Sequence, residues 1–382
     1  AWGGDPSVAA SPDGSTVAMA NMAYVINDPA ANPDANENAI VVSTSTDGGQ
    51  TFGHTQFANP TTCYGKSSDQ EALAADPTIA NRYWIVWRQQ GPEIGFYSTC
   101  GRGFDVGLDG SISWLAQEAP IPTPHADDFW PTSLRVFSVG GVLVQAQGDV
   151  VTIVNSDTNQ AAKNCGGLYG EKWYSVTSFD GGKTWTTTTL IAASALQWAC
   201  LPSDVNGQVQ TGIRDFAFVR EAAPRDGRTV ARMWVAIPTD YNTGFQLYRS
   251  DNLGQSWQPD ALVGAGNAQT FFPTLGIDDQ GHLGMSFQAL NNGSIQTWFA
   301  GTPAGSGFIA APITGLYSPT DSSGYTRSLG DYAGMATVPT GDLAVVGVTN
   351  NPTFLPAWTQ TAVDAFGVTN SQVTAALVEV SP

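Results

Sequence analysis

Charged side chains are scarce in this chain, so the few places where they gather are informative. Only 13% of its 382 residues are Asp, Glu, Lys or Arg. Carboxylates sharing one concave site can divide into a proton donor and a base or nucleophile. The residues that we expect to transfer protons or attack are Asp69, His125, Asp127, Asp128, Asp215 and Tyr332. The residues that we expect to bind substrate are Asp5, Glu71, Arg214, Arg327, Asp331, Trp130, Phe272 and Trp198.

A structural explanation competes with the chemical one at each of these positions. The aspartates also suit capping of strand starts, or binding of water or a cation. Of the three histidines, His125 is the one next to carboxylates and therefore the candidate for acid–base work. We expect His54 to be solvated and His282 to lie in a structural turn.

Most of these residues precede short apolar segments that belong to a repeat. Each copy has a polar start, an apolar strand, a Gly-containing or Asp-Pro turn and a second apolar strand. The copies begin at Asp5, Asp69, Phe129, Asp215, Phe272 and Asp331. They lie about 60 residues apart, which is room for four antiparallel strands. Together, 42 glycines and 23 prolines supply the many turns that short strands need.

A second motif, Ser-x-Asp-x-Gly-x-Thr-Trp, falls late in several copies. It occurs as Ser45–Phe52, as Ser178–Trp185, as Ser250–Trp257 with Asn in place of Asp, and in worn form as Asp109–Trp114. This is the Asp box, and through it the whole chain resembles the sialidase-like (BNR/Asp-box) β-propellers. The resemblance implies an all-β, six-bladed β-propeller of four-stranded antiparallel blades. In one domain, 1–382, the blades would span 1–62, 63–122, 123–210, 211–266, 267–323 and 324–382. The resemblance also implies that the box residues are structural and that the polar residues at the strand starts meet at one mouth of the channel.

Charge and cysteine content bear on the binding partners and the location of the protein. A net charge of −18 argues against nucleic-acid binding, and no apolar run is long enough to span a membrane. The start Ala1-Trp2-Gly3-Gly4 is typical of a processed, secreted chain. Four cysteines allow three pairings; we expect Cys63–Cys100 and Cys165–Cys200, with reduced thiols as the alternative. No Cys-x-x-Cys or Cys/His set indicates a metal site.

The expected activity follows from the resemblance and from where this chain departs from it. Sialidases use three arginines, a Tyr–Glu pair and an Asp acid, whereas the first blade here contains no arginine. Arg214 and Arg327 would supply two arginines, and Tyr332 or Tyr325 the tyrosine. We therefore expect a monomeric, exo-acting glycoside hydrolase for a glycan or polysaccharide other than the sialidase substrate. The alternatives are a polysaccharide lyase with a His/Tyr base and a non-catalytic glycan- or protein-binding propeller. We expect no required cofactor and allow for a structural cation such as calcium.

Overall fold

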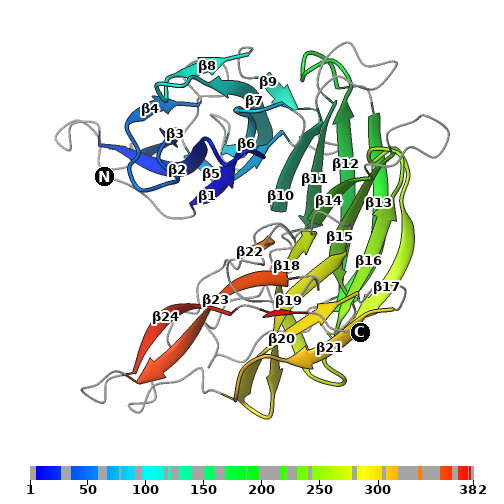
Figure 1. Cartoon of the computed structure of the whole chain (residues 1–382). Coiled ribbons are helices and arrows are strands. Elements are labelled where there is room, and N and C mark those ends of the chain that lie inside the picture. The colour runs from blue at the N-terminus through cyan, green and yellow to red at the C-terminus, as the bar shows by residue number, and fades with distance from the viewer. Residues whose placement is uncertain are drawn as a thin grey trace. The chain divides into compact units, whose positions relative to one another are not determined.

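The computed structural model describes strands and their turns over most of the chain. The described residues are 6–26, 36–58, 67–76, 79–90, 97–115, 119–121, 129–139, 150–159, 168–185, 187–197, 216–221, 230–239, 243–277, 282–302, 307–316, 334–337, 353–363, 369–376 and 378–379. Every element assigned among them is a β-strand (Figure 1). The chain divides into two compact units. Unit 1 comprises Ala1–Gln160, Glu171–Ala193 and Leu253–Gln255, and unit 2 comprises Ala161–Gly170, Ser194–Asn252 and Ser256–Pro382.

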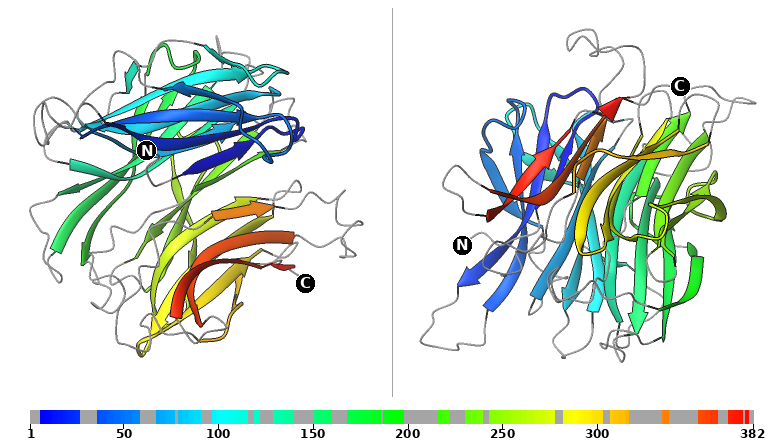
Figure 2. Two further views of the ribbon diagram at one scale, coloured as in Figure 1. Left: turned by 90° about the vertical axis from the view of Figure 1, so that its left-hand side faces the viewer. Right: turned by 90° about the horizontal axis from the view of Figure 1, so that it is seen from below.

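Within the described residues the strands form six antiparallel sheets. Neighbouring strands follow the chain order, except that Ala119–Ile121 pairs with Tyr97–Val106 and Val378–Glu379 pairs with Thr353–Val363. Two further views show the strands of each sheet lying side by side (Figure 2). The prediction of an all-β fold built from antiparallel sheets is thereby confirmed for the described residues; five of these sheets have four strands, and the second has five. The count of six blades, their ranges and a single closed domain over 1–382 stay predictions.

Unit 1 holds the first and second sheets and most of the third. The first sheet consists of β1 (Ser7–Ala10), β2 (Val17–Ile26), β3 (Asn36–Ser45) and β4 (His54–Phe57). The second consists of β5 (Ser67–Ala75), β6 (Arg82–Gln90), β7 (Tyr97–Val106), β8 (Ile112–Trp114) and β9 (Ala119–Ile121). The third consists of β10 (Phe129–Val139), β11 (Val150–Asn159), β12 (Leu168–Ser178) and β13 (Thr187–Gln197).

Unit 2 holds the remaining sheets. The fourth consists of β14 (Phe216–Glu221), β15 (Val230–Pro238), β16 (Phe245–Ser250) and β17 (Gln258–Val263). The fifth consists of β18 (Gln269–Ile277), β19 (Leu283–Asn291), β20 (Ser294–Gly301) and β21 (Ile309–Pro312). The sixth consists of β22 (Gly334–Thr337), β23 (Thr353–Val363), β24 (Thr369–Ala375) and β25 (Val378–Glu379).

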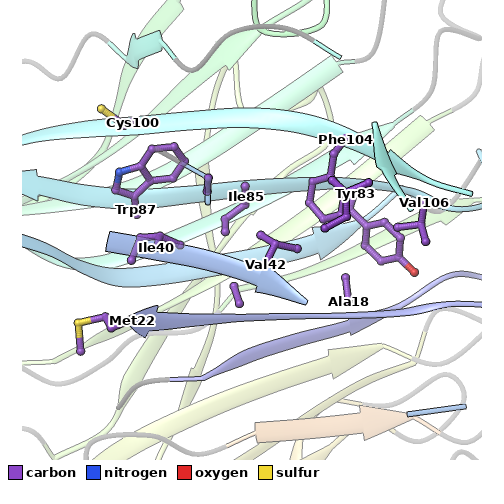
Figure 3. Close-up of a cluster of buried hydrophobic side chains, with 13 residues drawn as sticks. Ala18, Met22, Ile40, Val42, Tyr83, Ile85, Trp87, Cys100, Phe104 and Val106 are labelled. Carbon is purple, nitrogen blue, oxygen red and sulfur yellow. The ribbon is translucent and has the colours of Figure 1, made fainter. Parts of the chain in front are cut away.

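The core of unit 1 follows from side-chain alternation along β6. Tyr83, Ile85 and Trp87 pack into a cluster with side chains of the first sheet (Figure 3). The intervening Trp84 and Val86 pack instead into a cluster with side chains of the third sheet. Because β6 is buried on both faces, it reads as a nearly continuous apolar run. Each such fully buried large side chain contributes on the order of 2–3 kcal/mol.

The core of unit 2 repeats this arrangement between the fourth and fifth sheets. Phe245 and Leu247 of β16 and Met285 and Phe287 of β19 belong to one buried cluster. Phe245 meets Phe287 edge to face with ring centroids 5.8 Å apart, and Phe287 stacks on Trp298 at 6.4 Å. Edge-to-face and stacked rings add to the stabilisation from burial alone.

The Asp boxes form the hydrogen-bonded turns that their sequences predict. In the first box, the Asp47 carboxylate accepts hydrogen bonds from the Thr51 backbone N–H at 2.9 Å and from the Ser45 hydroxyl at 2.7 Å. The Thr51 hydroxyl, followed by that of Ser45, lowers the pKa of Asp47 to about 2. Asp180 of the second box accepts the same three bonds, from Thr184 and Ser178. These contacts support a structural role for the box.

Three box tips in unit 1 contact the sheet that precedes them in the chain. Gly182 lies against the ring of Trp84 on β6. The carbonyl of Leu253 accepts hydrogen bonds from Thr152 on β11 and Thr177 on β12, both at 3.1 Å. In the worn copy, the carbonyl of Gly110 accepts one from Thr44 on β3. Within unit 1, each of these three turns therefore contacts a sheet formed earlier in the chain.

Candidate functional site

Most of the residues predicted to act on substrate lie outside the described part of the chain. They are Asp5, His125, Asp127, Asp128, Trp198, Arg214, Asp215, Arg327, Asp331 and Tyr332. For Trp130 the structure gives a place on β10 and nothing of its side chain. Asp69, Glu71 and Phe272 are described with their surroundings. The roles of all fourteen residues stay predictions.

Buried charge gathers in the second sheet. Among the described residues, the buried charged side chains are those of Glu71, Asp76, Arg88 and Arg102, and all four belong to this sheet or its turns. Charged groups are rarely buried unless they are paired, because removing them from water is costly. Four in one sheet of a chain with few charges therefore require an explanation, in structure or in function.

Two of the four have structural explanations. Asp76 accepts a hydrogen bond from the Ile79 backbone N–H at 3.0 Å and thereby caps the turn between β5 and β6. The Arg102 guanidinium lies 3.9 Å from the ring centroid of Trp114 and donates to the carbonyl of Ala58 at 3.3 Å. A guanidinium over an indole face is a favourable cation–π pair. Glu71 and Arg88 remain, at the start of β5 and the end of β6.

The start of β5 pairs with the end of β6 in two polar rungs. Ser68 lies opposite Gln89, and Asp69 lies opposite Arg88. The Ser68 hydroxyl donates to the Gln89 side-chain oxygen at 2.8 Å, and the Trp87 indole N–H donates to the same oxygen at 3.3 Å. Arg88 and Asp69 form an ion pair. The arginine side chain is 5% exposed and the aspartate side chain 27% exposed.

A β-bulge follows directly after the Asp69–Arg88 rung. The register shifts between Asp69 and Ala72, which places Gln70 and Glu71 together in the bulge. Glu71 is 5% exposed. Bulges are common next to active sites because the extra residue redirects side chains. β5 thus presents a partly exposed, ion-paired carboxylate and, two residues on, a buried one.

Equivalent bulges interrupt the first strands of two other sheets. The register of β10 shifts between Pro131 and Leu134, and that of β18 shifts between Phe271 and Thr274. In each case the shift comes early in the strand, as it does in β5. The recurrence indicates that the bulge belongs to the repeat, whereas the residues inside it differ from sheet to sheet.

Phe272 occupies the bulge of β18, within unit 2. Its φ is 51°, a left-handed value that is unusual for an aromatic residue. It is buried and meets Phe271 edge to face, with ring centroids 5.2 Å apart. Its predicted contact with substrate stays a prediction, and its observed contact is with a neighbouring aromatic ring.

The sequence prediction missed Ser68, Arg88 and Gln89. A signal for the last two was present, because Arg88, Gln89 and Gln90 directly follow the apolar run from Tyr83 to Trp87. A strand that ends in polar residues opposite a polar strand start places those side chains side by side. Only the pairing register identifies which of them meet.

Among the described residues, no group of three or more His, Cys, Asp or Glu side chains is arranged to hold a metal ion. No helix in the part that the structure describes is long and apolar enough to cross a membrane. Cys100 is buried on β7 and disulfide-bonded. The other three cysteines lie outside the described residues, so the Cys63–Cys100 and Cys165–Cys200 pairings stay predictions.

Comparisons with known proteins find distant likeness of fold. No protein-family profile and no curated protein matches the chain. The solved structures that it matches include a Trypanosoma rangeli sialidase in complex with the inhibitor DANA, at 11% identity and TM-score 0.45, covering 96% of this chain. A Hadza microbial sialidase matches at 11% identity and TM-score 0.48, covering 96%. A Penicillium chrysogenum α-L-arabinanase complexed with arabinobiose matches at 12% identity and TM-score 0.49, covering 97%.

The lengths covered differ among these proteins. This chain spans 54% and 64% of the two sialidases and 92% of the arabinanase. The TM-scores of all three are below 0.5, so neither a family nor an activity follows for this chain.

Proposed function

We propose that this protein is a secreted, monomeric glycoside hydrolase whose acidic site lies where the first strands of its sheets begin. The observation that carries the proposal is the β5 bulge, which presents Asp69 and Glu71 within three residues of one strand. Hydrolysis of a glycosidic bond needs two carboxyl groups, one to protonate the leaving oxygen and one to act as nucleophile or base. The fold that we propose around them is a closed, six-bladed propeller of the sialidase-like kind.

The two carboxyl groups differ in environment, as this chemistry requires. Asp69 is partly exposed and paired with the Arg88 guanidinium. Glu71 is buried, and a carboxyl group removed from water suits the role of proton donor. In the proposed reaction Glu71 protonates the leaving oxygen and Asp69 acts as the nucleophile or base.

The predicted residues outside the described part complete the proposal. His125, Asp127, Asp128, Asp215 and Tyr332 are the further candidates for proton transfer or attack. Arg214 and Arg327 would orient the substrate, with Asp5, Asp331, Trp130, Trp198 and Phe272 beside it. No cofactor takes part in the proposed reaction, and a structural cation such as calcium is compatible with it.

A screen of glycans with matched variants tests the proposal. Turnover is measured as release of reducing sugar from a panel of glycosides and polysaccharides, and binding is measured on a glycan array. Asp69→Asn and Glu71→Gln should each lower kcat by about 100-fold or more. The control is Asp105→Asn, because Asp105 also pairs with an arginine of β6, Arg82, at 2.8 Å, away from the bulge.

The outcomes separate the alternatives. Wild-type turnover that is lost in the Asp69 and Glu71 variants but kept in the Asp105 variant supports the hydrolase. Products carrying the ultraviolet absorbance of an unsaturated uronate would identify a lyase. Binding without turnover of any glycan would identify a carbohydrate-binding propeller. Full activity in both site variants would place the chemistry on the other sheets.

A further inference from the structure

We propose that Arg88 is a positioning residue for the reaction, holding the Asp69 carboxylate beside the β5 bulge. The inference rests on the proposed function. Arg88 comes from β6, the second strand of the sheet, and reaches the first strand across one rung of the ladder. None of the residues predicted from the sequence has this role.

The burial of the pair is one-sided. The Arg88 side chain is 5% exposed, whereas the Asp69 side chain is 27% exposed. A guanidinium offers a planar set of donors, so it constrains the orientation of a carboxylate more than a lysine ammonium does. The arginine therefore binds the carboxylate from the buried side, and the partly exposed Asp69 stays accessible to a ligand.

The pair also lies next to the bulge and next to a second hydrogen-bonded rung. Asp69 is the last residue of β5 that is in register before the shift. On the other side, the oxygen of Gln89 accepts from both Ser68 and Trp87, which anchors the end of β6. The ion pair therefore holds Asp69 at the edge of the bulge that contains Glu71.

The same strand carries a second arginine that serves as a matched control. Arg82 lies at the opposite end of β6 and donates to both carboxylate oxygens of Asp105, at 2.8 and 3.0 Å. Its side chain is 22% exposed and that of Asp105 is 39% exposed. The register is continuous at this rung. Arg82 and Arg88 thus share residue type, strand and kind of partner, and differ in burial and in proximity to the bulge.

The Arg88 guanidinium is paired with Asp69. In this proposal Arg88 therefore does not bind an anionic group of the substrate. Its removal should therefore affect the chemical step more than substrate binding. A displaced catalytic group of this kind can lower the rate by about 100-fold even when the displacement is near 1 Å. KM should change little, for neutral and for anionic glycosides alike.

The test compares Arg88→Met, Arg88→Lys and Arg82→Met in the full chain, on whichever glycoside the screen identifies. We expect Arg88→Met to lower kcat by about 100-fold with KM within about threefold of the wild type. Millimolar guanidinium should restore part of this activity in Arg88→Met and none in Arg82→Met. Arg88→Lys, which keeps the charge and therefore the fold, should lose about tenfold in kcat at an almost unchanged Tm.

Two results would overturn the inference. In the first, Arg88→Met and Arg88→Lys keep the wild-type kcat. In the second, kcat falls only in proportion to the folded fraction, as we expect for Arg82→Met. Both results leave the hydrolase proposal intact, because the wild type still turns over its substrate. If the wild type turns over no glycoside, the proposed function fails, and the positioning role fails with it.

Discussion

Gly182 lies so close to Trp84 that no side chain fits between them. A β-carbon built on Gly182 would come within 2.3 Å of Cη2 of the indole. The φ of Gly182 is 76°, in the left-handed region that favours glycine. This one residue therefore satisfies two requirements at once: the conformation of its own Asp-box turn and contact with the second sheet.

Gly182→Ala should destabilise the protein through both effects. The left-handed backbone costs about 1–2 kcal/mol for a residue with a β-carbon, and forcing a methyl group against the indole costs roughly 1–3 kcal/mol more. The free energy of unfolding, measured with urea, reports the sum. Gly49→Ala is the control, because Gly49 occupies the same box position at φ 86° with no atom near its missing β-carbon. Equal losses in the two variants would contradict the proposed clash.

Asp47→Asn should reduce the sensitivity of the fold to acid. The pKa of Asp47 is lowered from its ordinary value of 3.8 to about 2 by bonds from Thr51 and Ser45. A carboxylate with a lowered pKa stabilises the fold above its ordinary value and loses that contribution as the pH falls through its folded value. Tm of the wild type should therefore fall between about pH 4 and about pH 2, and Tm of the variant should fall less.

The third Asp box supplies the reason to expect a folded variant. There Asn252 accepts the Ser256 backbone N–H at 2.9 Å and the Ser250 hydroxyl at 3.0 Å, as Asp47 does from its own partners. Asp47→Asn should accordingly have nearly the wild-type Tm at neutral pH. Identical acid profiles for variant and wild type would show that Asp47 contributes nothing to acid unfolding.

Removing both hydroxyls that bind the Leu253 carbonyl should lower the free energy of unfolding by more than the sum of the two single removals. Thr152 and Thr177 are buried, and their hydroxyls lie 2.9 Å apart and 3.1 Å from that carbonyl. Either threonine alone satisfies it, so each Thr→Val change should cost about 1 kcal/mol. The double variant leaves a buried carbonyl without these donors and should lose roughly 1–3 kcal/mol beyond the sum. A double-mutant cycle in urea measures this; an additive result would contradict it.

A non-reducing peptide map should show Cys100 linked to Cys63, and Cys165 linked to Cys200. The structure contains a disulfide at Cys100 and leaves its partner open. Cys100→Ala should lower the free energy of unfolding by about 2–4 kcal/mol, which is typical of the loss of a native disulfide. A fragment that joins Cys100 to Cys165 or Cys200 would overturn the predicted pairing.

What the sequence predicts well is local chemistry. The Asp boxes combine a capping side chain with glycines at fixed offsets, and their bonds close within five residues. The antiparallel strands and their hairpins follow from turn residues between short apolar runs. Such features depend on neighbours along the chain, so the order of the residues is sufficient to identify them.

What the sequence left open depends on register and on contacts between sheets. The sequence predicts Asp69 as a site residue. Its partner Arg88 lies nineteen residues away and becomes its neighbour only through the pairing of β5 with β6. The bulge that holds Glu71 adds one residue to the spacing, which alternation along a strand does not reveal. The contact of Gly182 with Trp84 likewise joins residues of different repeats.

The docking of box tips on the preceding sheet has a consequence for synthesis and for truncation. The ribosome synthesises the chain from its N-terminus. The side chains that contact a box tip, such as Trp84 and Thr152, therefore stay uncovered until part of the next repeat has been made. The third sheet is the clearest case, since the tripeptide Leu253–Gln255 belongs to the first compact unit. A fragment cut after β13 would leave Thr152 and Thr177 without the carbonyl they hold. An expression boundary drawn directly after β13 therefore removes this contact, and an N-terminal fragment that keeps it has to include Leu253–Gln255.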